Sequence, residues 1–253
     1  MTDNIENQKT QRRGFLGALA TGAAALGLAT ITSPFKLNAQ EPQKTVPLNA
    51  PQEPKKSVPS TPPQEGENPG DVWLRNLGGK HRVVFDATRP HELIPFAWPR
   101  VFLLTNAATG TPENDCGVIV VLRHEAIPYA FEDRIWASYK FGEMFKADDP
   151  KTKAPAVRNP FWQPMRGDFI IPGFGQVAIG INELQASGVK FCVCDAAITV
   201  YSSMAAEGDN AKLSLSMKRK WLEGLLPGIQ VVPSGVWALG RAQENGFKYI
   251  FAG

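Results

Sequence analysis

The chain has 253 residues, of which 43% are hydrophobic and 20% charged, a composition typical of a globular protein with one or two domains. Its formal net charge is +3, and a basic N-terminal segment supplies part of it, so the rest of the chain carries about +1. Proteins that bind nucleic acid concentrate positive charge on one face. A nearly neutral domain therefore excludes that class, and we expect no nucleic-acid partner.

The N-terminal segment has the pattern of an export signal. Residues 10–16, TQRRGFL, resemble the twin-arginine consensus, and a mildly apolar stretch runs from Phe15 to Ile31. The segment ends in Leu37-Asn38-Ala39, which is typical of a cleavage site. We interpret residues 1–39 as a twin-arginine signal peptide, which predicts a periplasmic protein that is exported folded. An uncleaved membrane anchor is the alternative, because the apolar stretch is just long enough.

Residues 40–70 predict a disordered linker. They contain eight prolines and almost no large apolar side chains. Such a segment cannot bury enough surface to offset the entropy of an ordered chain. We therefore expect a folded domain from residue 71 to residue 253.

Five apolar runs in this domain predict strands, at residues 81–85, 117–122, 189–194, 229–232 and 247–251. The second run is apolar on both faces, which is typical of a strand buried in a parallel sheet. Stretches with helical spacing separate the runs. This alternation predicts an α/β fold with a mostly parallel sheet of about five strands, covered on both faces.

The helical stretches differ in clarity. One begins near Ile94, where two early prolines indicate a late start or an irregular helix. Residues 128–146 predict one helix with an aromatic inner face, and 147–175 a proline-rich loop. A helix is expected over 176–187, and one or two over 195–223. Ser234 is a candidate N-cap for a last helix that ends before Gly246.

Polar and reactive residues follow several of the predicted strands. Ligands bind open α/β sheets beyond the carboxyl ends of the strands. The expected ligand-binding residues there are Asp86 after the first strand, Arg123 after the second, Asp195 after the third, and Ser234 and Gly235 after the fourth. No zinc-type spacing, phosphate-binding loop or Ser-His-Asp signature occurs, so we expect no metal and can name no cofactor.

Cys194 is the preferred reactive group. It ends a buried strand at the start of a helix, where backbone N–H groups stabilise a thiolate. His124, at the end of the second strand, could serve as its base, and we name both as candidate catalytic residues. The alternatives are a small buried cysteine and a histidine that fixes its loop. Cys192 is expected on the same face of the strand but deeper, and Cys116 at the opposite edge.

The C-terminal half resembles the DsrE/DsrF-like family. The resemblance rests on residues 188–197, GVKFCVCDAA, on residues 225–236, LLPGIQVVPSGV, and on residues 242–250, AQENGFKYI. It implies a three-layer α/β/α sandwich that assembles as a homo- or hetero-oligomer. In some members, the cysteine matching Cys194 carries sulfur as a persulfide. The longer, aromatic stretch over 125–175 departs from the small members, and residues 158–162 could cover the site.

Two functions follow as hypotheses. The first is a periplasmic protein that accepts and transfers sulfane sulfur on Cys194, working as a homo-oligomer with a periplasmic sulfur or redox partner. The second is a non-enzymatic module that binds a small ligand or cofactor, or assists assembly. The sequence leaves open whether the protein is an enzyme.

Overall fold

The computed structural model describes residues 68–173, 175–206 and 211–253. The predicted signal peptide, and the predicted linker up to residue 67, lie outside the described residues. Within the described ranges, no helix is both long enough and apolar enough to cross a membrane.

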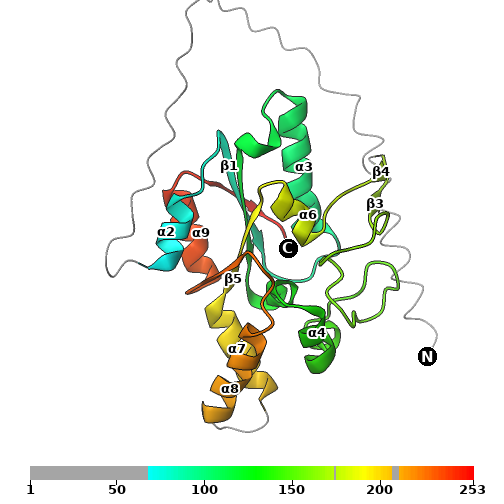
Figure 1. Cartoon of the computed structure of the whole chain (residues 1–253), viewed down its shortest axis with the longest axis vertical. Helices are drawn as coiled ribbons and strands as arrows, with labels where there is room; N and C mark the ends of the chain where they lie inside the picture. The colour runs from blue at the N-terminus through cyan, green and yellow to red at the C-terminus, as the bar shows by residue number, and fades with distance from the viewer. Residues whose placement is uncertain (1–67, 174, 207–210) are drawn as a thin grey trace, which may run out of the picture. The chain divides into compact units, whose positions relative to one another are not determined.

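A parallel sheet of five strands forms the centre of the described chain (Figure 1). Its strands are β1 His81–Ala87, β2 Cys116–Leu122, β5 Lys190–Cys194, β6 Ile229–Val232 and β7 Lys248–Phe251, in the order β6-β5-β2-β1-β7. All five predicted strands are present, and every neighbouring pair is parallel. Every residue of β2 is buried, as its run of apolar side chains predicted.

Helices cover both faces of this sheet, which confirms the three-layer α/β/α architecture (Figure 1). On one face lie α2 Pro69–Arg75 and α9 Gly235–Glu244, over a buried cluster that includes Val84, Ile119 and Cys192. On the other face lie α3 Ile94–Ala108, α6 Ile181–Ala186 and the 3-10 helix η2 His124–Ala130, over a larger cluster rich in aromatic rings.

Two further helices extend beyond the carboxyl edge of the sheet. They are α7 Asp195–Ala205, which continues directly from β5, and α8 Ala211–Leu222, which packs against α7 (Figure 1). At the opposite edge, a short 3-10 helix, η1 Glu113–Asp115, leads into β2.

The stretch predicted as one helix over 128–146 is instead η2 followed by α4 Asp133–Tyr139 and α5 Phe141–Met144. Lys140 separates α4 from α5 with a left-handed backbone at φ 50°, which interrupts the helical hydrogen bonds. The predicted inner face was nevertheless correct in large part, because Phe131, Ile135, Trp136, Phe141 and Phe145 are all buried. Residues 147–175 are mainly loop, as expected.

The predicted helix over 176–187 starts too early. Residues Gly175–Gln176 form β4, which pairs antiparallel with β3 Ile170–Ile171, and α6 begins only at Ile181. Gly180 is the N-cap, and its backbone N–H donates to the Glu183 carboxylate at 2.8 Å. The glycine that weakened the helical pattern therefore marks the start of the helix.

Two helix starts at prolines also differ from expectation. α3 begins at Ile94 with Pro95 in its first turn, where a missing N–H costs nothing, rather than starting late. Pro99 lies inside α3 and removes one donor. α2 was not expected, because Asn68 and Pro69, which cap and begin it, belong to the proline-rich stretch. The Asn68 side chain accepts the N–H of Gly70 at 2.8 Å.

Candidate functional site

The carboxyl ends of β2, β5 and β6 surround a pocket of about 610 Å³. Five of the seven residues proposed from the sequence line it: Arg123, His124, Cys194, Ser234 and Gly235. Asp86 and Asp195 do not. The remaining lining residues come mainly from α7 and its surroundings: Glu125, Met144, Ala196, Ala197, Val200, Tyr201, Met204 and Val236.

Cys194 is the N-cap residue of α7. Its sulfur accepts the backbone N–H of Ala197 at 3.3 Å, in the position that a serine or aspartate oxygen takes at most helix starts. The residue is only 6% exposed, yet it contributes to the pocket wall. The sulfur therefore lies at the positive end of the α7 helix dipole, beside a backbone N–H donor.

Arg123 places a guanidinium beside this pocket, and Asp86 holds it. Its Nε and Nη2 donate to the two carboxylate oxygens of Asp86 at 2.7 and 2.9 Å. The hydroxyl of Tyr249, on β7, donates to the same fully buried carboxylate at 2.9 Å. The hydrogen bonds to Asp86 raise the pKa of Arg123, and the Cys194 side chain adds a smaller contribution. Arg123 and Cys194 both line the pocket.

The two residues after β6 act through the backbone. The Ser234 hydroxyl accepts the N–H of Trp237 at 3.2 Å, so Ser234 caps α9 as predicted. Gly235 faces Arg123 so closely that a Cβ at residue 235 would lie 2.4 Å from the Arg123 Cβ. The glycine therefore provides the space in which the aliphatic part of Arg123 runs toward Asp86.

His124 lies in the pocket with a left-handed backbone at φ 51°. Its Nδ1 is 3.1 Å from the Tyr201 hydroxyl, within hydrogen-bond distance, and no hydrogen bond joins it to Cys194 among the described residues. Burial, and to a smaller extent Glu125, raise the pKa of Tyr201, so the phenol stays protonated. It donates to Nδ1 or accepts the Nδ1 hydrogen, according to the tautomer of His124. Tyr201 thus orients the imidazole inside the pocket that Cys194 lines.

Asp195 has a different role from the one expected. Its carboxylate lies 2.7 Å from the ammonium of Lys218 on α8, so it joins α7 to α8 rather than lining the pocket. The ion pair offsets the negative charge that Asp195 brings next to Cys194.

The other two cysteines lie away from this site, and all three are free thiols. Cys192 is fully buried, and burial raises its thiol pKa. Cys192 and Cys194 belong to buried clusters on opposite faces of the sheet, which corrects the expectation of a common face. The reason is that strand alternation ends where Cys194 turns into α7.

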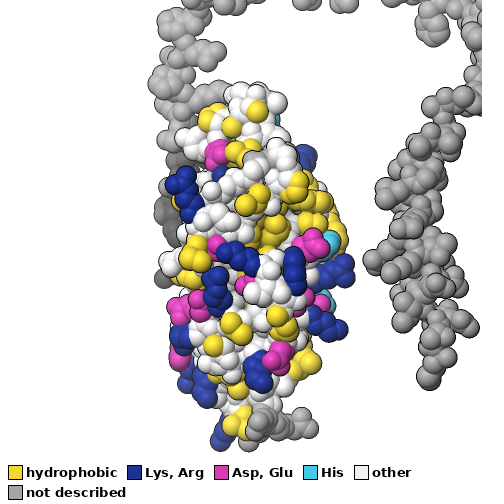
Figure 2. Space-filling model, turned by 90° about the vertical axis from the view of Figure 1, so that its right-hand side faces the viewer, with side chains coloured by type: hydrophobic (Ala, Val, Ile, Leu, Met, Phe, Trp, Pro, Cys, Tyr) yellow, Lys and Arg dark blue, Asp and Glu magenta, His cyan; other side chains and the backbone are white. Residues whose placement is uncertain are grey.

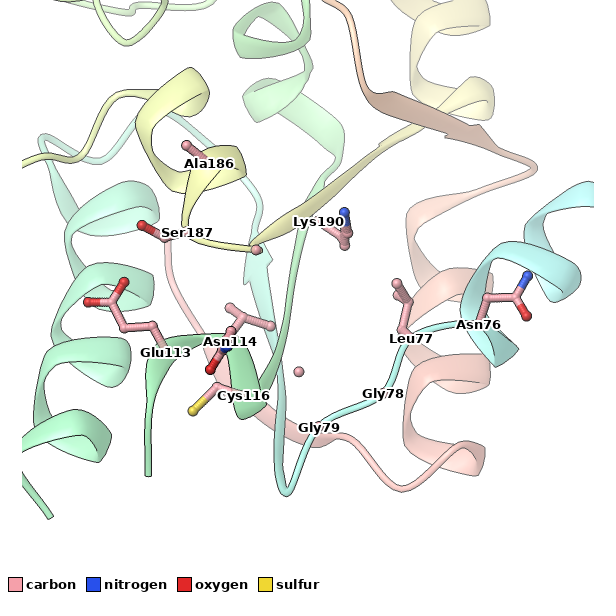
Figure 3. Close-up of a pocket in the computed structure, with 13 residues that line it drawn as sticks. Asn76, Leu77, Gly78, Gly79, Glu113, Asn114, Cys116, Ala186, Ser187 and Lys190 are labelled. Carbon is pink, nitrogen blue, oxygen red and sulfur yellow. The ribbon is translucent and has the colours of Figure 1, made fainter. Parts of the chain in front are cut away.

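Cys116 begins β2 at the amino edge, as expected. It lies beside a second pocket of about 660 Å³, between the ends of α2 and α6, whose wall is largely backbone at Gly78, Gly79 and Gly188 (Figure 3). Burial raises the pKa of the Cys116 thiol, and Asp115 and Glu113 raise it further. A neutral thiol at this edge does not favour nucleophilic chemistry.

The segment over 158–162 does not cover the Cys194 pocket, because none of its residues lines it. Phe161 instead stacks on Phe96 in the core, with ring centroids 4.2 Å apart. Of the described residues in the long stretch over 125–175, only Glu125 and Met144 reach the pocket. Among the described residues, no group of three or more histidine, cysteine or acidic side chains is arranged to hold a metal ion.

Sequence reasoning missed Tyr201 and Tyr249, the tyrosines that contact His124 and Asp86. Tyr201 could have been found, because it lies four residues after Ala197 and therefore on the same face of α7. Tyr249 could not, because its contact depends on β7 lying beside β1.

Comparison with known proteins identifies no family. No family model matches the chain, and no curated protein matches it. A solved structure of a protein of unknown function from Methanobacterium thermoautotrophicum is similar, with a TM-score of 0.37 and 19% sequence identity. The alignment covers 68% of this chain and 99% of that one.

Proposed function

We propose that this chain is a sulfur-handling protein in which Cys194 accepts sulfane sulfur and passes it on. The observation that supports this most directly is the hydrogen bond from the Ala197 N–H to the Cys194 sulfur, in a pocket that also contains Arg123. The N–H donor and the guanidinium both stabilise negative charge on sulfur. They would act on the thiolate and on the persulfide anion alike.

The transfer needs no external oxidant. The Cys194 thiolate attacks the terminal sulfur of a donor persulfide, R–S–SH. A new S–S bond forms at Cys194, the S–S bond of the donor breaks, and the electron pair leaves with R–S⁻. An acceptor thiolate then attacks the terminal sulfur on Cys194, which releases the Cys194 thiolate. In this scheme Nδ1 of His124 carries a hydrogen and donates it to the Tyr201 oxygen, so Nε2 is free to accept the proton of the incoming thiol.

The proposal extends to location and partners. A twin-arginine signal in residues 1–39 would direct the protein to the periplasm, where a sulfur or redox partner would deliver or remove the sulfur. We propose that the protein works there as a homo-oligomer. Val200, Met204 and Val236 are exposed around the pocket, so its outer wall is apolar and suits contact with another protein.

The same apolar wall favours a second candidate, a module that binds a small ligand or cofactor without catalysis. In that case the ligand binds in the pocket without reacting, and Arg123 binds an anionic group of the ligand. In this case Cys194 contributes only to the wall.

The intact mass of the mature protein after brief exposure to polysulfide separates the two candidates. We expect the wild type and Cys116→Ser to gain whole sulfur atoms and to lose them again when a reductant is added. Cys194→Ser should gain none. Cys116→Ser is the matched control, because Cys116 lies at the opposite edge of the sheet. An equal gain in Cys194→Ser would contradict sulfur transfer at this residue. A tightly bound small molecule in native mass spectra, without any sulfur gain, would favour the module.

A further inference from the structure

A separate pocket of about 460 Å³ lies between the loop after β1 and the long stretch that precedes α6. It shares no lining residue with the Cys194 pocket. Figure 2 shows the side of the molecule that carries β3 and β4, where basic and acidic side chains are intermixed. The pocket is lined by Pro90, His91, Glu92, Leu93, Tyr129, Lys146, Asp148, Asp149, Pro150, Lys153, Asp168, Phe169 and Ile170.

Tyr129 is the most deeply buried polar side chain in this lining, with 2% of the residue exposed. The rings of Phe96, Phe161 and Trp136 surround its ring, with centroids 5.2, 5.4 and 5.7 Å away. Its hydroxyl has no hydrogen-bond partner within the part of the chain that the structure describes. The neighbouring Trp136, by contrast, donates its Nε1 hydrogen to a backbone carbonyl at 2.9 Å. An unpartnered hydroxyl at such depth is costly unless a ligand or water binds it.

The Tyr129 side chain contributes to the pocket lining. Burial raises the pKa of this phenol, and the Asp148 carboxylate raises it further. Asp148 is an exposed residue of the pocket lining. The phenol therefore stays protonated at neutral pH and offers a hydrogen to whatever occupies the pocket.

The pocket lining carries charges of both signs, with two lysines and four carboxylates. Asp168 pairs with the Lys151 ammonium at 2.5 Å, whereas Asp149 accepts only the backbone N–H groups of Lys151 and Thr152, at 2.8 and 3.1 Å, and keeps its negative charge. Two cations and two anions of the lining make no hydrogen bond or ion pair through their side chains among the described residues: Lys146, Lys153, Glu92 and Asp148. Unpaired cations and anions in one lining suit a ligand with one charge of each sign better than a phosphate or a polyamine, which would meet like charges there.

Three of these four residues have a left-handed backbone, at φ 49° for Glu92, 52° for Lys146 and 58° for Lys153. This conformation is uncommon outside glycine. Each turn directs a charged residue to the edge of the same pocket. One wall is apolar, formed by Leu93, Phe169 and Ile170, and gives an aliphatic group a place to pack.

We propose that this pocket binds a zwitterionic amino acid. The carboxylate of the ligand accepts the hydrogen of the Tyr129 hydroxyl and lies between the lysines, and its ammonium pairs with Asp148. The apolar wall receives its side chain. This function is independent of sulfur transfer at Cys194.

Calorimetric titration of the purified protein tests the proposal with three probes of similar shape. L-Leucine carries both charges, 4-methylpentanoate only the anionic one, and 3-methylbutylamine only the cationic one. We expect heat of binding with L-leucine, and binding at least about tenfold weaker with either single-charge probe. Tyr129→Phe removes only the unpartnered oxygen, so it should fold normally and bind L-leucine about tenfold more weakly.

Tyr139→Phe is the matched control, because Tyr139 is a half-buried tyrosine of α4 that lies outside this pocket. It should bind L-leucine as the wild type does. The proposal is overturned if L-leucine does not bind at millimolar concentration, if Tyr129→Phe binds it as tightly as Tyr139→Phe, or if either single-charge probe binds equally well.

Discussion

Replacing Asp86 with asparagine removes one charge from the centre of the carboxyl edge and leaves the shape of the side chain unchanged. Asp86 is fully buried and accepts three hydrogen bonds, two from Arg123 and one from Tyr249. An asparagine can accept at only one atom, and its NH₂ group would face an N–H of the guanidinium. The substitution therefore breaks the bidentate pair and leaves the Arg123 charge without its counter-ion.

The expected loss of unfolding free energy is about 3 kcal/mol. Breaking one side of a buried ion pair costs roughly 3–5 kcal/mol. The lower end of this range applies here because the Arg123 side chain is 27% exposed, so water can solvate part of the unpaired guanidinium charge. For a domain of this size, each kcal/mol lowers the melting temperature by roughly 2–4 °C, so Asp86→Asn should melt about 9 °C below the wild type.

Thermal unfolding followed by circular dichroism measures this difference. Asp71→Asn is the matched control, because Asp71 pairs with Arg241 at the surface, 3.3 Å away, where an ion pair contributes little. A second measurement is the alkylation rate of Cys194, which should fall in Asp86→Asn because Arg123 no longer has a fixed position. A melting temperature within about 2 °C of the wild type would refute the reasoning, since the carboxylate would then not hold the guanidinium.

Three further changes should have measurable effects. Gly235→Ala should lower the melting temperature by several degrees and alter Cys194 alkylation, because the new Cβ would lie 2.4 Å from the Arg123 Cβ; unchanged values would contradict this close approach. Ser234→Ala should cost about 1 kcal/mol in urea unfolding through loss of the α9 cap, and Ser234→Thr should cost less. The hydrogen bond from Lys151 lowers the pKa of Asp168, so its stabilisation is present above the unfolded-state pKa and is lost as pH falls through the lower folded-state value. In Lys151→Met the free energy of unfolding should therefore fall less between neutral and acidic pH than it does in the wild type. An unchanged dependence of the unfolding free energy on pH would show that the pair does not contribute.

The strands could be predicted from the sequence because each is a short apolar run bounded by polar residues or glycine. The fully buried β2 was the clearest, since only a strand covered on both faces has such a pattern. Helix boundaries were harder, because they depend on single residues. The left-handed turn at Lys140 splits one predicted helix into two, and lysine gives no local signal for such a turn.

The candidate site was predicted in part. Parallel strands end at a common edge of the sheet, so residues that follow different strands are expected to lie together. The structure confirms this for five of them, which line one pocket: Cys194, His124, Arg123, Ser234 and Gly235. Asp86 and Asp195 also follow strands but do not line the pocket, because the position of a residue along a strand does not determine which partner its carboxylate binds. Asp86 turns inward to Arg123, and Asp195 outward to Lys218.

The pairing of β1 with β7 joins the first and the last strand of the sheet. Since β7 follows the other four strands of the sheet along the chain, β1 keeps one edge unpaired until those strands and β7 have all been synthesised. Contacts between residues so distant along the chain slow folding, because a long loop must close before the pairing is gained. The sheet is therefore completed late, and until β7 pairs, the open edge of β1 can pair with another chain.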